Sequence, residues 1–284
     1  MFLFFAAITL LPILAASVPA DRQPLGPAPS FPVFNELRVA KRMIIGGEVS
    51  EEDSHPWFVG FNKPGHFVCG GTIVGHRWIL TAAHCVGHIS TAVVGLKNKR
   101  GEGGHEQSYE IQEKIVHENH DWPMNDIALI KTKENIVFNS RVNRINLPTS
   151  DSLVPPGTNV TVLGFGLNEL SFPDKFESSK HEHLRDQILE TIIPVEDNSK
   201  CENDLFHPEL HICTQTELKV PNHGDSGGPL FKKVGRMSPK LDFQFGIVSF
   251  GRTDKLSYAV YTRISAYCEW IQRTTKGEVQ CRDP

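Results

Sequence analysis

A serine surrounded by glycines in the second half of the chain has the setting of a nucleophile. The segment reads GDSGGPL over residues 224–230, with Ser226 at its centre. Small neighbours let a substrate approach the hydroxyl and leave adjacent backbone N–H groups free to face a developing oxyanion. Most serines are only surface hydroxyls, so the interpretation depends on finding a base and an orienting carboxylate elsewhere in the chain.

The order of the histidines along the chain decides between two kinds of hydrolase. The same segment matches GxSxG, the nucleophile elbow of α/β-hydrolases, in which the catalytic histidine follows the serine. All 13 histidines of this chain precede Ser226. The α/β-hydrolase interpretation is therefore excluded, and the base must come from upstream.

Two upstream segments supply a candidate base and a candidate carboxylate. His84 stands in LTAAHC at 80–85, and Asp126 stands in NDIALI at 125–130. An aspartate that leads into such an apolar run is expected to leave water, and burial of a carboxylate is costly unless the group is paired. We predict that His84 is the partner of Asp126.

The elements that must position these residues are mostly strands. Every second side chain is apolar over residues 241–247 and 159–162, as a half-buried strand requires. Short apolar runs separated by glycine and proline recur, which predicts an all-β sandwich or barrel. The clearest helix is C-terminal, where we expect Ser265 to cap the first turn and Gly277 to end the helix.

Composition and charge restrict the class of protein. The 284 residues are 39% hydrophobic and 22% charged, which is ordinary for a globular chain and suits one large or two modest units. The formal net charge is −4, without a basic block. This balance argues against nucleic acid or an anionic membrane as a partner.

The N-terminus has the features of a secretory signal peptide. Residues 1–20 carry no charged side chain and end in small residues. A signal anchor is the alternative, since about 20 apolar residues can just span a bilayer. Residues 21–43 contain several prolines and the basic pair Lys41-Arg42, and we interpret them as a pro-segment.

The six cysteines fall into couples that are close in sequence. A secreted chain passes through an oxidising compartment, where disulfides persist, so local pairing is the economical prediction among those that six thiols allow. No CxxC-type spacing indicates zinc, and one glycosylation sequon begins at Asn159. The couples are Cys69 with Cys85, Cys201 with Cys213, and Cys268 with Cys281.

Four motifs in order make the chain resemble a trypsin/chymotrypsin-type serine protease. They are IIGG at 44–47, LTAAHC at 80–85, NDIALIK at 125–131 and GDSGGPL at 224–230, and the similarity extends to about Trp270. The resemblance implies an all-β fold of two packed six-stranded antiparallel β-barrels with a C-terminal α-helix. The implied protease domain spans 44–284, with barrels at about 44–155 and 156–264 and the helix at about 265–276.

The resemblance also implies roles for these residues. Ser226 would attack the scissile carbonyl, His84 would take its proton and later give it to the leaving amine, and Asp126 would hold the imidazole tautomer. The backbone N–H groups of Gly224 and Ser226 would form the oxyanion hole, and Ser249 would help to hold Asp126. Peptide bonds would be cut through an acyl-enzyme.

Activation in this family pairs a new N-terminal ammonium with a buried carboxylate, which assigns Ile44 and Asp225 to that step. The residue before Ile44 is Met43, where relatives usually carry Arg or Lys. Cleavage after Lys41-Arg42 would leave an extra methionine and move the ammonium out of register. We therefore expect either cleavage after Met43 by a non-tryptic activator or trimming of Met43 after a dibasic cut.

The specificity pocket departs from that of trypsin. The residue at its base stands six positions before the nucleophile in this family, which here is Val220. Without a carboxylate there, an Arg or Lys side chain would be buried unpaired. Gly251 and Ala259 would line the walls, and the methyl of Ala259 would narrow the slot. We predict cleavage after apolar residues, medium-sized rather than large aromatic.

The combined prediction is a secreted, extracellular serine endopeptidase made as a zymogen. Its partners would be a protein or peptide substrate, an activating protease and protein inhibitors. No cofactor, metal, nucleic acid or membrane is expected, since residues 102–113 lack the start of a calcium loop and His181 and His183 lack metal spacing. The alternative is a catalytically silent protease homologue that binds a partner. Such proteins usually lose a triad member, whereas this chain keeps all three.

Overall fold

The computed structural model of the chain describes most of its residues from Glu48 onward. The described residues all fall within 40–284, which cluster as one unit by their contacts. The predicted signal peptide and pro-segment, with Ile44 and Val220, lie outside them. The described ranges are 48–51, 53–63, 66–98, 103–165, 187–201, 204–216, 221, 224–235, 241–252 and 257–284.

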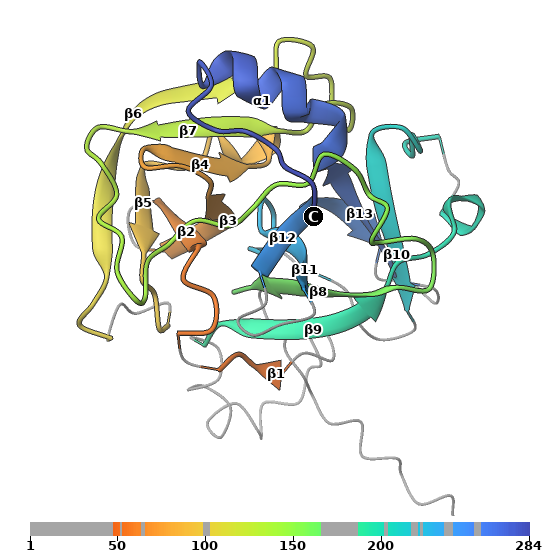
Figure 1. Cartoon of the computed structure of the whole chain (residues 1–284), viewed down its shortest axis with the longest axis horizontal. Helices are drawn as coiled ribbons and strands as arrows, with labels where there is room; N and C mark the ends of the chain where they lie inside the picture. The colour runs from red at the N-terminus through yellow and green to blue at the C-terminus, as the bar shows by residue number, and fades with distance from the viewer. Residues whose placement is uncertain are drawn as a thin grey trace, which may run out of the picture. The chain divides into compact units, whose positions relative to one another are not determined.

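Six antiparallel strands close into a barrel in the order β2-β3-β4-β7-β6-β5. Figure 1 shows them in orange to yellow-green. Phe61, Ile79 and Leu129 are fully buried in the core of this barrel. The strands are β2 (Phe58–Lys63), β3 (His66–Ile73), β4 (Trp78–Thr81), β5 (Thr91–Val94), β6 (Gln107–Val116) and β7 (Ala128–Thr132).

The other strands form a seven-stranded sheet in the order β1-β9-β8-β11-β12-β13-β10. An isolated bridge between Val195 and Thr214 brings the segment after β9 to β10, so the sheet curls toward closure. The predicted all-β class is confirmed, and β1 is a seventh strand that the prediction did not include. The strands are β1 (Glu48–Val49), β8 (Asn159–Gly164), β9 (Leu189–Pro194), β10 (His211–Thr216), β11 (Pro229–Val234), β12 (Leu241–Arg252) and β13 (Ser257–Arg263).

Strand β12 follows the predicted alternation, but the prediction that it is half-buried was wrong. Phe243 and Phe245 are buried as expected, and Gln244 between them is fully buried too. The first barrel supplies a partner on that face, because Thr72 Oγ1 donates to Gln244 Oε1 at 2.6 Å. The Gln244 Nε2 donates to the Gly246 carbonyl at 3.0 Å. A polar side chain can lie inside when both ends of its amide are hydrogen-bonded.

The C-terminal helix begins later than predicted. Residues Ile264–Tyr267 form a 3₁₀ turn, η4, and helix α1 (Cys268–Thr274) follows it. Ser265 does not cap the helix, because its hydroxyl donates to Asp151 Oδ2 at 3.0 Å. Gly277 lies beyond the helix with φ of 83°, a left-handed conformation that glycine adopts without a steric penalty.

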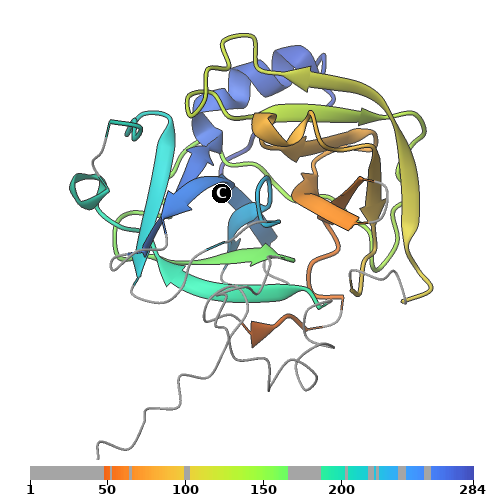
Figure 2. The ribbon, with the colours of Figure 1, turned by 180° about the vertical axis from the view of Figure 1, so that it is seen from behind.

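Helix α1 lies beside the first barrel, although it follows the second sheet in the chain. Figure 1 and Figure 2 show the blue helix next to β6 and β7. Trp270 Nε1 donates to Glu118 Oε2 at 2.7 Å, and the His117 ring contacts Tyr267 and Trp270. The last segment of the chain therefore ties the two halves together. In the described part of the chain, no helix has the length and apolar character to cross a bilayer.

Three disulfides join the cysteines that are close in sequence, as the spacing predicted. Cys69–Cys85 ties β3 to η1 (Ala83–Cys85), a short 3₁₀ turn after β4. The other two join Cys201, which follows η3 (Asn198–Lys200), to Cys213 in β10, and Cys268 in α1 to Cys281. Each crosslink of this kind contributes about 2–4 kcal/mol by restricting the unfolded chain.

Candidate active site

His84 and Asp126 form a hydrogen-bonded pair within the first barrel. His84 lies in η1, and Asp126 lies two residues before β7. The ring Nδ1 is 2.7 Å from Asp126 Oδ2, and the His84 backbone N–H donates to Asp126 Oδ1 at 2.9 Å. An ionised carboxylate can only accept, so Nδ1 carries the proton and Nε2 is the free basic nitrogen. The Asp126 side chain is fully buried, whereas that of His84 is 29% exposed.

Two hydroxyl groups from the second sheet also hold Asp126. Ser249 Oγ in β12 donates to Asp126 Oδ2 at 2.5 Å. Thr262 Oγ1 in β13 donates to the Asp126 carbonyl at 2.8 Å. The aspartate therefore belongs to the first barrel by sequence, and it is held from both halves of the molecule.

The ionisation of Asp126 follows from these contacts. Burial by itself raises the pKa of Asp126, but the hydrogen bonds and charge of His84 and the hydroxyl of Ser249 outweigh that effect. The pKa therefore lies below its ordinary value. The carboxylate stays ionised at neutral pH and stabilises positive charge on the adjacent ring.

The residue before Asp126, Asn125, has a left-handed backbone conformation, and this turn places Asp126 in the interior. Asn125 has φ of 53°, a conformation that asparagine tolerates better than most residues. Its side chain is fixed at both ends, since Tyr267 Oη donates to Oδ1 at 3.2 Å and Nδ2 donates to the Asn119 carbonyl at 2.8 Å. The turn before Asp126 is therefore anchored to η4.

Ser226 lies in a turn that connects the second sheet to the first barrel. The Gly70 N–H in β3 donates to the Ser226 carbonyl at 2.8 Å, and the Gly227 N–H donates to the Val248 carbonyl in β12 at 2.9 Å. Gly227 has φ of 78°, and a Cβ on it would lie 2.2 Å from Thr81 Oγ1. Only glycine fits here, so the turn is pressed against the strand that leads to His84.

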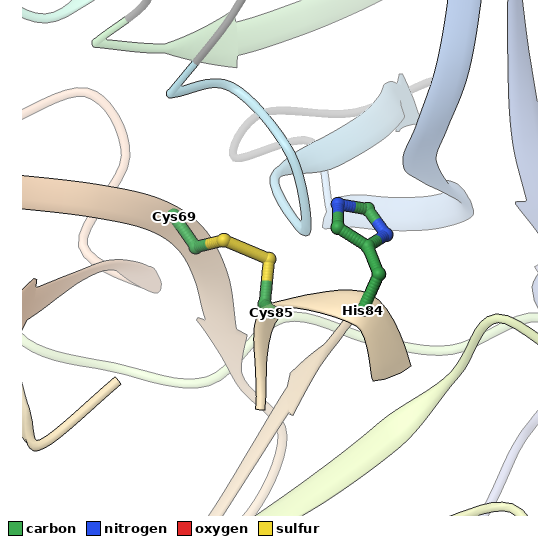
Figure 3. Close-up of side chains that lie close together, drawn as sticks. All are labelled: Cys69, His84 and Cys85. Carbon is green, nitrogen blue, oxygen red and sulfur yellow. A yellow bond between two sulfur atoms is a disulfide. The ribbon is translucent and has the colours of Figure 1, made fainter. Parts of the chain in front are cut away.

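The hydroxyl of Ser226 and the ring of His84 are not joined by a hydrogen bond. Among the residues that the structure describes, neither Ser226 Oγ nor His84 Nε2 has a hydrogen-bond partner. Figure 3 shows the ring projecting from η1 on the side of the pale blue loop that leads into β11. Of the three predicted catalytic residues, Asp126 and His84 are therefore joined by a hydrogen bond, and the Ser226 hydroxyl is bonded to neither. In general such contacts to a nucleophile shorten in the complex with substrate.

Two backbone N–H groups flank Asp225 and point to no acceptor. Gly224 has φ of 99°. Within the described ranges, the N–H groups of Gly224 and Ser226 make no hydrogen bond. Asp225 between them is fully buried against β8, where a Cβ on Gly164 would lie 2.1 Å from Asp225 Oδ1. This turn therefore leaves the Gly224 and Ser226 N–H groups available to a ligand, while the Asp225 carboxyl points into the interior.

The two described residues of the predicted specificity pocket face each other across a ladder. Gly251 in β12 pairs with Ala259 in β13. Ala259 is fully buried, and a Cβ on Gly251 would lie 2.6 Å from the Tyr258 carbonyl. The structure brings these two positions together, while the third, Val220, lies outside the described residues.

His84 also lies beside a disulfide, where three groups have the types of metal ligands. Ligand-type atoms of Cys69, His84 and Cys85 lie within 4.8 Å of one another. Figure 3 shows that both sulfurs belong to the Cys69–Cys85 bond. A disulfide offers no thiolate, so this cluster presents a metal ion with the imidazole alone.

Sequence reasoning missed two residues of this site. Thr262 gives no signal, because a threonine in a predicted strand has no distinctive partner until the strands pair. Asn125 gives a weak signal, since asparagine directly before a buried aspartate is suited to a left-handed turn. Ser249 was expected from the resemblance, and its hydroxyl contacts Asp126 as implied.

A chymotrypsin-like hydrolase is defined here by a closed barrel, a curled second sheet and a partly exposed histidine bonded to a buried aspartate. The trypsin family model matches residues 44–271, and the chain belongs to the trypsin family of serine proteases. It is 32% identical over 242 residues to duodenase-1 of Bos taurus, covering 82% of this chain and 89% of that protein. It is 31% identical over 242 residues to mast cell protease 3 of Ovis aries, with 82% and 89% covered, and 31% identical over 250 residues to granzyme C of Mus musculus, with 84% and 94% covered.

Proposed function

We propose that this protein is a secreted serine endopeptidase that hydrolyses peptide bonds through an acyl-enzyme. Ser226 Oγ attacks the scissile carbonyl while His84 Nε2 takes the hydroxyl proton and later gives it to the leaving amine. Asp126 keeps the proton on Nδ1 and stabilises the imidazolium. The observation that carries the proposal is the fully buried Asp126 carboxylate bound to a ring that remains 29% exposed.

The developing oxyanion is bound by the N–H groups of Gly224 and Ser226. Supporting this role, both donors lack an intramolecular acceptor among the described residues, and they flank the buried Asp225. Loss of one donor of this kind lowers turnover by about 10²–10³-fold. Water then cleaves the acyl-enzyme with His84 again acting as the base.

A fluorophosphonate probe tests the assignment of the nucleophile. The activated protein should gain one adduct on Ser226, and Ser226→Ala should gain none. Ser152→Ala is the matched control, because Ser152 is exposed and its hydroxyl, among the described residues, hydrogen-bonds to the exposed Ser150 alone. A folded, activated protein that reacts with no probe would be a silent homologue that binds a partner, and the proposal would be wrong.

Activation removes residues up to Met43 and frees the amino group of Ile44, which pairs with Asp225. Supporting this role, the Asp225 carboxyl is fully buried and stands directly before Ser226, between the two N–H groups assigned to the oxyanion hole. The route is either cleavage after Met43 or a cut after Arg42 followed by trimming by a second protease. N-terminal sequencing of active protein should read IIGG, and fully active protein that begins with Met43 would contradict both routes.

The preferred residue on the acyl side of the cleaved bond is apolar and of medium size. Supporting this preference, Val220 stands at the predicted base of the pocket, and the buried Ala259 faces Gly251. A peptide-library profile should favour residues such as valine or leucine over arginine and lysine. A clear preference for basic residues would contradict the assignment of Val220.

Secretion and glycosylation complete the proposal. Asn159 is the exposed first residue of β8, so its side chain is accessible to glycosylation. Expression through the secretory pathway should yield protein whose mass falls on glycosidase treatment, and Asn159→Gln should abolish that fall. Protein inhibitors of serine proteases should bind the activated form better than the precursor.

A further inference from the structure

A second buried histidine lies close to the segment that carries Asp126. His211 is the first residue of β10 and is fully buried. Its ring contacts Phe250, the neighbour of Ser249, edge-on at 5.8 Å between centroids. It also contacts Phe206 at 5.8 Å. The imidazole thus lies between an aromatic ring of β12 and one of the segment that precedes β10.

Both ring nitrogens of His211 meet groups that fix its tautomer. The His207 backbone N–H donates to Nδ1 at 3.0 Å, so Nδ1 must be unprotonated. Nε2 lies 3.3 Å from the Pro123 carbonyl, which can only accept, so Nε2 must carry the proton. His211 is therefore a neutral imidazole protonated on Nε2, the tautomer opposite to that of His84.

The contact to Pro123 crosses from the second sheet to the first barrel. Pro123 stands in the turn that ends with Asn125 and Asp126, before β7. A second contact between the two halves lies beside it. His211 of β10 is paired with Thr262 of β13, and the Thr262 hydroxyl donates to the Asp126 carbonyl. Neighbouring positions on β10 and β13 thus hold the turn at two points.

We propose that His211 is a positioning residue for catalysis, whose Nε2–H bond to the Pro123 carbonyl fixes the turn that presents Asp126 to His84. The inference rests on the proposed function, because it gives Asp126 a catalytic role. His211 touches no reacting atom, and its effect is transmitted through the backbone from Pro123 to Asp126.

The surroundings of His211 favour its neutral form. His207 and Glu209 face it from the preceding turn, Asp126 from the first barrel, and Arg263 from β13, where its guanidinium donates to the His211 carbonyl at 2.7 Å. Burial is the largest influence and lowers the pKa of His211 to about 4. A proton on Nδ1 would also point at the His207 N–H and displace that hydrogen bond. The neutral ring, with both of its hydrogen bonds, is therefore the main form above about pH 4.

Two substitutions separate the hydrogen bond from the volume of the ring. His211→Gln keeps an N–H donor close to the place of Nε2, whereas His211→Leu fills similar space without a donor. We expect kcat of the leucine variant on a peptide substrate to fall about tenfold, the value for one lost hydrogen bond of about 1.4 kcal/mol. We expect KM to change by less than about twofold and the glutamine variant to recover most of kcat.

Two measurements that do not depend on enzyme activity also test the contact between His211 Nε2 and the Pro123 carbonyl. In 15N-histidine-labelled wild-type protein, the His211 signals should show the Nε2-protonated tautomer from pH 7 to pH 5. Amide hydrogen exchange of Met124 and Ile127, whose N–H groups donate within this turn, should be about tenfold faster in His211→Leu by the same estimate. Exchange in β8 should be unchanged.

The outcomes distinguish this inference from the proposed function. If the wild type shows the tautomer and the leucine variant shows the faster exchange while neither reacts with fluorophosphonate, the proposed function fails and the contact stands. If wild-type His211 is protonated on Nδ1 at pH 7, the inference is wrong whether or not the leucine variant folds. Equal kcat for a folded leucine variant and the wild type also overturns it, as does equal impairment of the glutamine and leucine variants.

Discussion

Two histidine–carboxylate pairs in this protein have nearly the same nitrogen–oxygen distance and opposite exposure to solvent. In the candidate active site, the distance is 2.7 Å, Asp126 is fully buried and His84 is 29% exposed. Between the segment after β1 and β9, the distance is 2.6 Å, His55 is only 4% exposed and Glu190 is 33% exposed. The partner that faces solvent is the ring in the first pair and the carboxylate in the second.

This difference determines what each pair can do. An exposed ring whose Nε2 is free can exchange a proton with a substrate. The ring of His55 lies instead against Trp57 and Phe231, and in the described structure its Nδ1 is buried without a partner. A histidine bonded to a carboxylate therefore does not by itself indicate catalysis. The exposure of the ring and the other hydrogen bonds of the carboxylate decide it.

The largest contrast between the pairs should come from replacing each carboxylate by an amide. Asp126→Asn permits the wrong tautomer of His84 and should lower kcat by about 10⁴-fold. Glu190→Gln is the matched control and should leave kcat within about twofold, because His55 touches no substrate. Peptide hydrolysis by both activated variants measures the effect. A comparable loss in the glutamine variant would contradict the structural assignment of His55 and Glu190.

A smaller effect should follow from removing one donor to the buried carboxylate. Ser249→Ala deprives Asp126 Oδ2 of the hydroxyl at 2.5 Å, and kcat should fall about 10–100-fold, since a hydrogen bond to a charged group contributes about 1.5–3 kcal/mol. Ser265→Ala is the control, because it removes a similar hydroxyl bond to Asp151, away from the site. Kinetics and chemical denaturation of both variants should show that only the first alters kcat.

The pH dependence of stability should reveal the pair whose carboxylate faces solvent, His55 with Glu190. The bond to His55 is the largest influence on Glu190 and lowers its pKa. As the pH falls below about 4.3, the unfolded state binds the proton first, so the free energy of unfolding decreases through the lower pKa of the folded state. Glu190→Gln should flatten this decrease by less than about 1 kcal/mol, because the pair is partly screened by solvent. Urea unfolding from pH 5 to pH 3 measures it, and an unchanged slope would contradict the prediction.

The smallest effect should come from replacing the buried ring of the second pair with phenylalanine. His55→Phe keeps an aromatic ring against Trp57 and Phe231 and removes the unpartnered Nδ1, while Glu190 can be hydrated. Because Glu190 is 33% exposed, water can solvate its carboxylate after the ring is replaced, and a contact this close to solvent contributes little, so the melting temperature should stay the same or rise slightly. His55→Ala loses the ring contacts and should melt at a lower temperature. A large loss of stability in the phenylalanine variant would show that the pair itself holds β1.

The parts of the site that sequence could predict are those with local causes. A reactive serine needs small neighbours, and Gly227 is required by its left-handed backbone and its closeness to Thr81. The alternation over residues 241–247 predicted β12, since side chains of a strand alternate in direction. The same alternation could not show that Gln244 is buried, because its hydroxyl partner Thr72 comes from another barrel.

The amino-acid sequence by itself determined which groups are available for chemistry and the order in which they occur. It also determined the strand-rich architecture, because side-chain type and spacing act over a few residues. Only the tertiary structure decided that Asp126 would meet Ser249, 123 residues away, and Thr262, 136 residues away. It also made one histidine–carboxylate pair accessible and buried the ring of the other. Hydrogen-bond partners and exposure depend on how distant strands pack, and no local pattern encodes that packing.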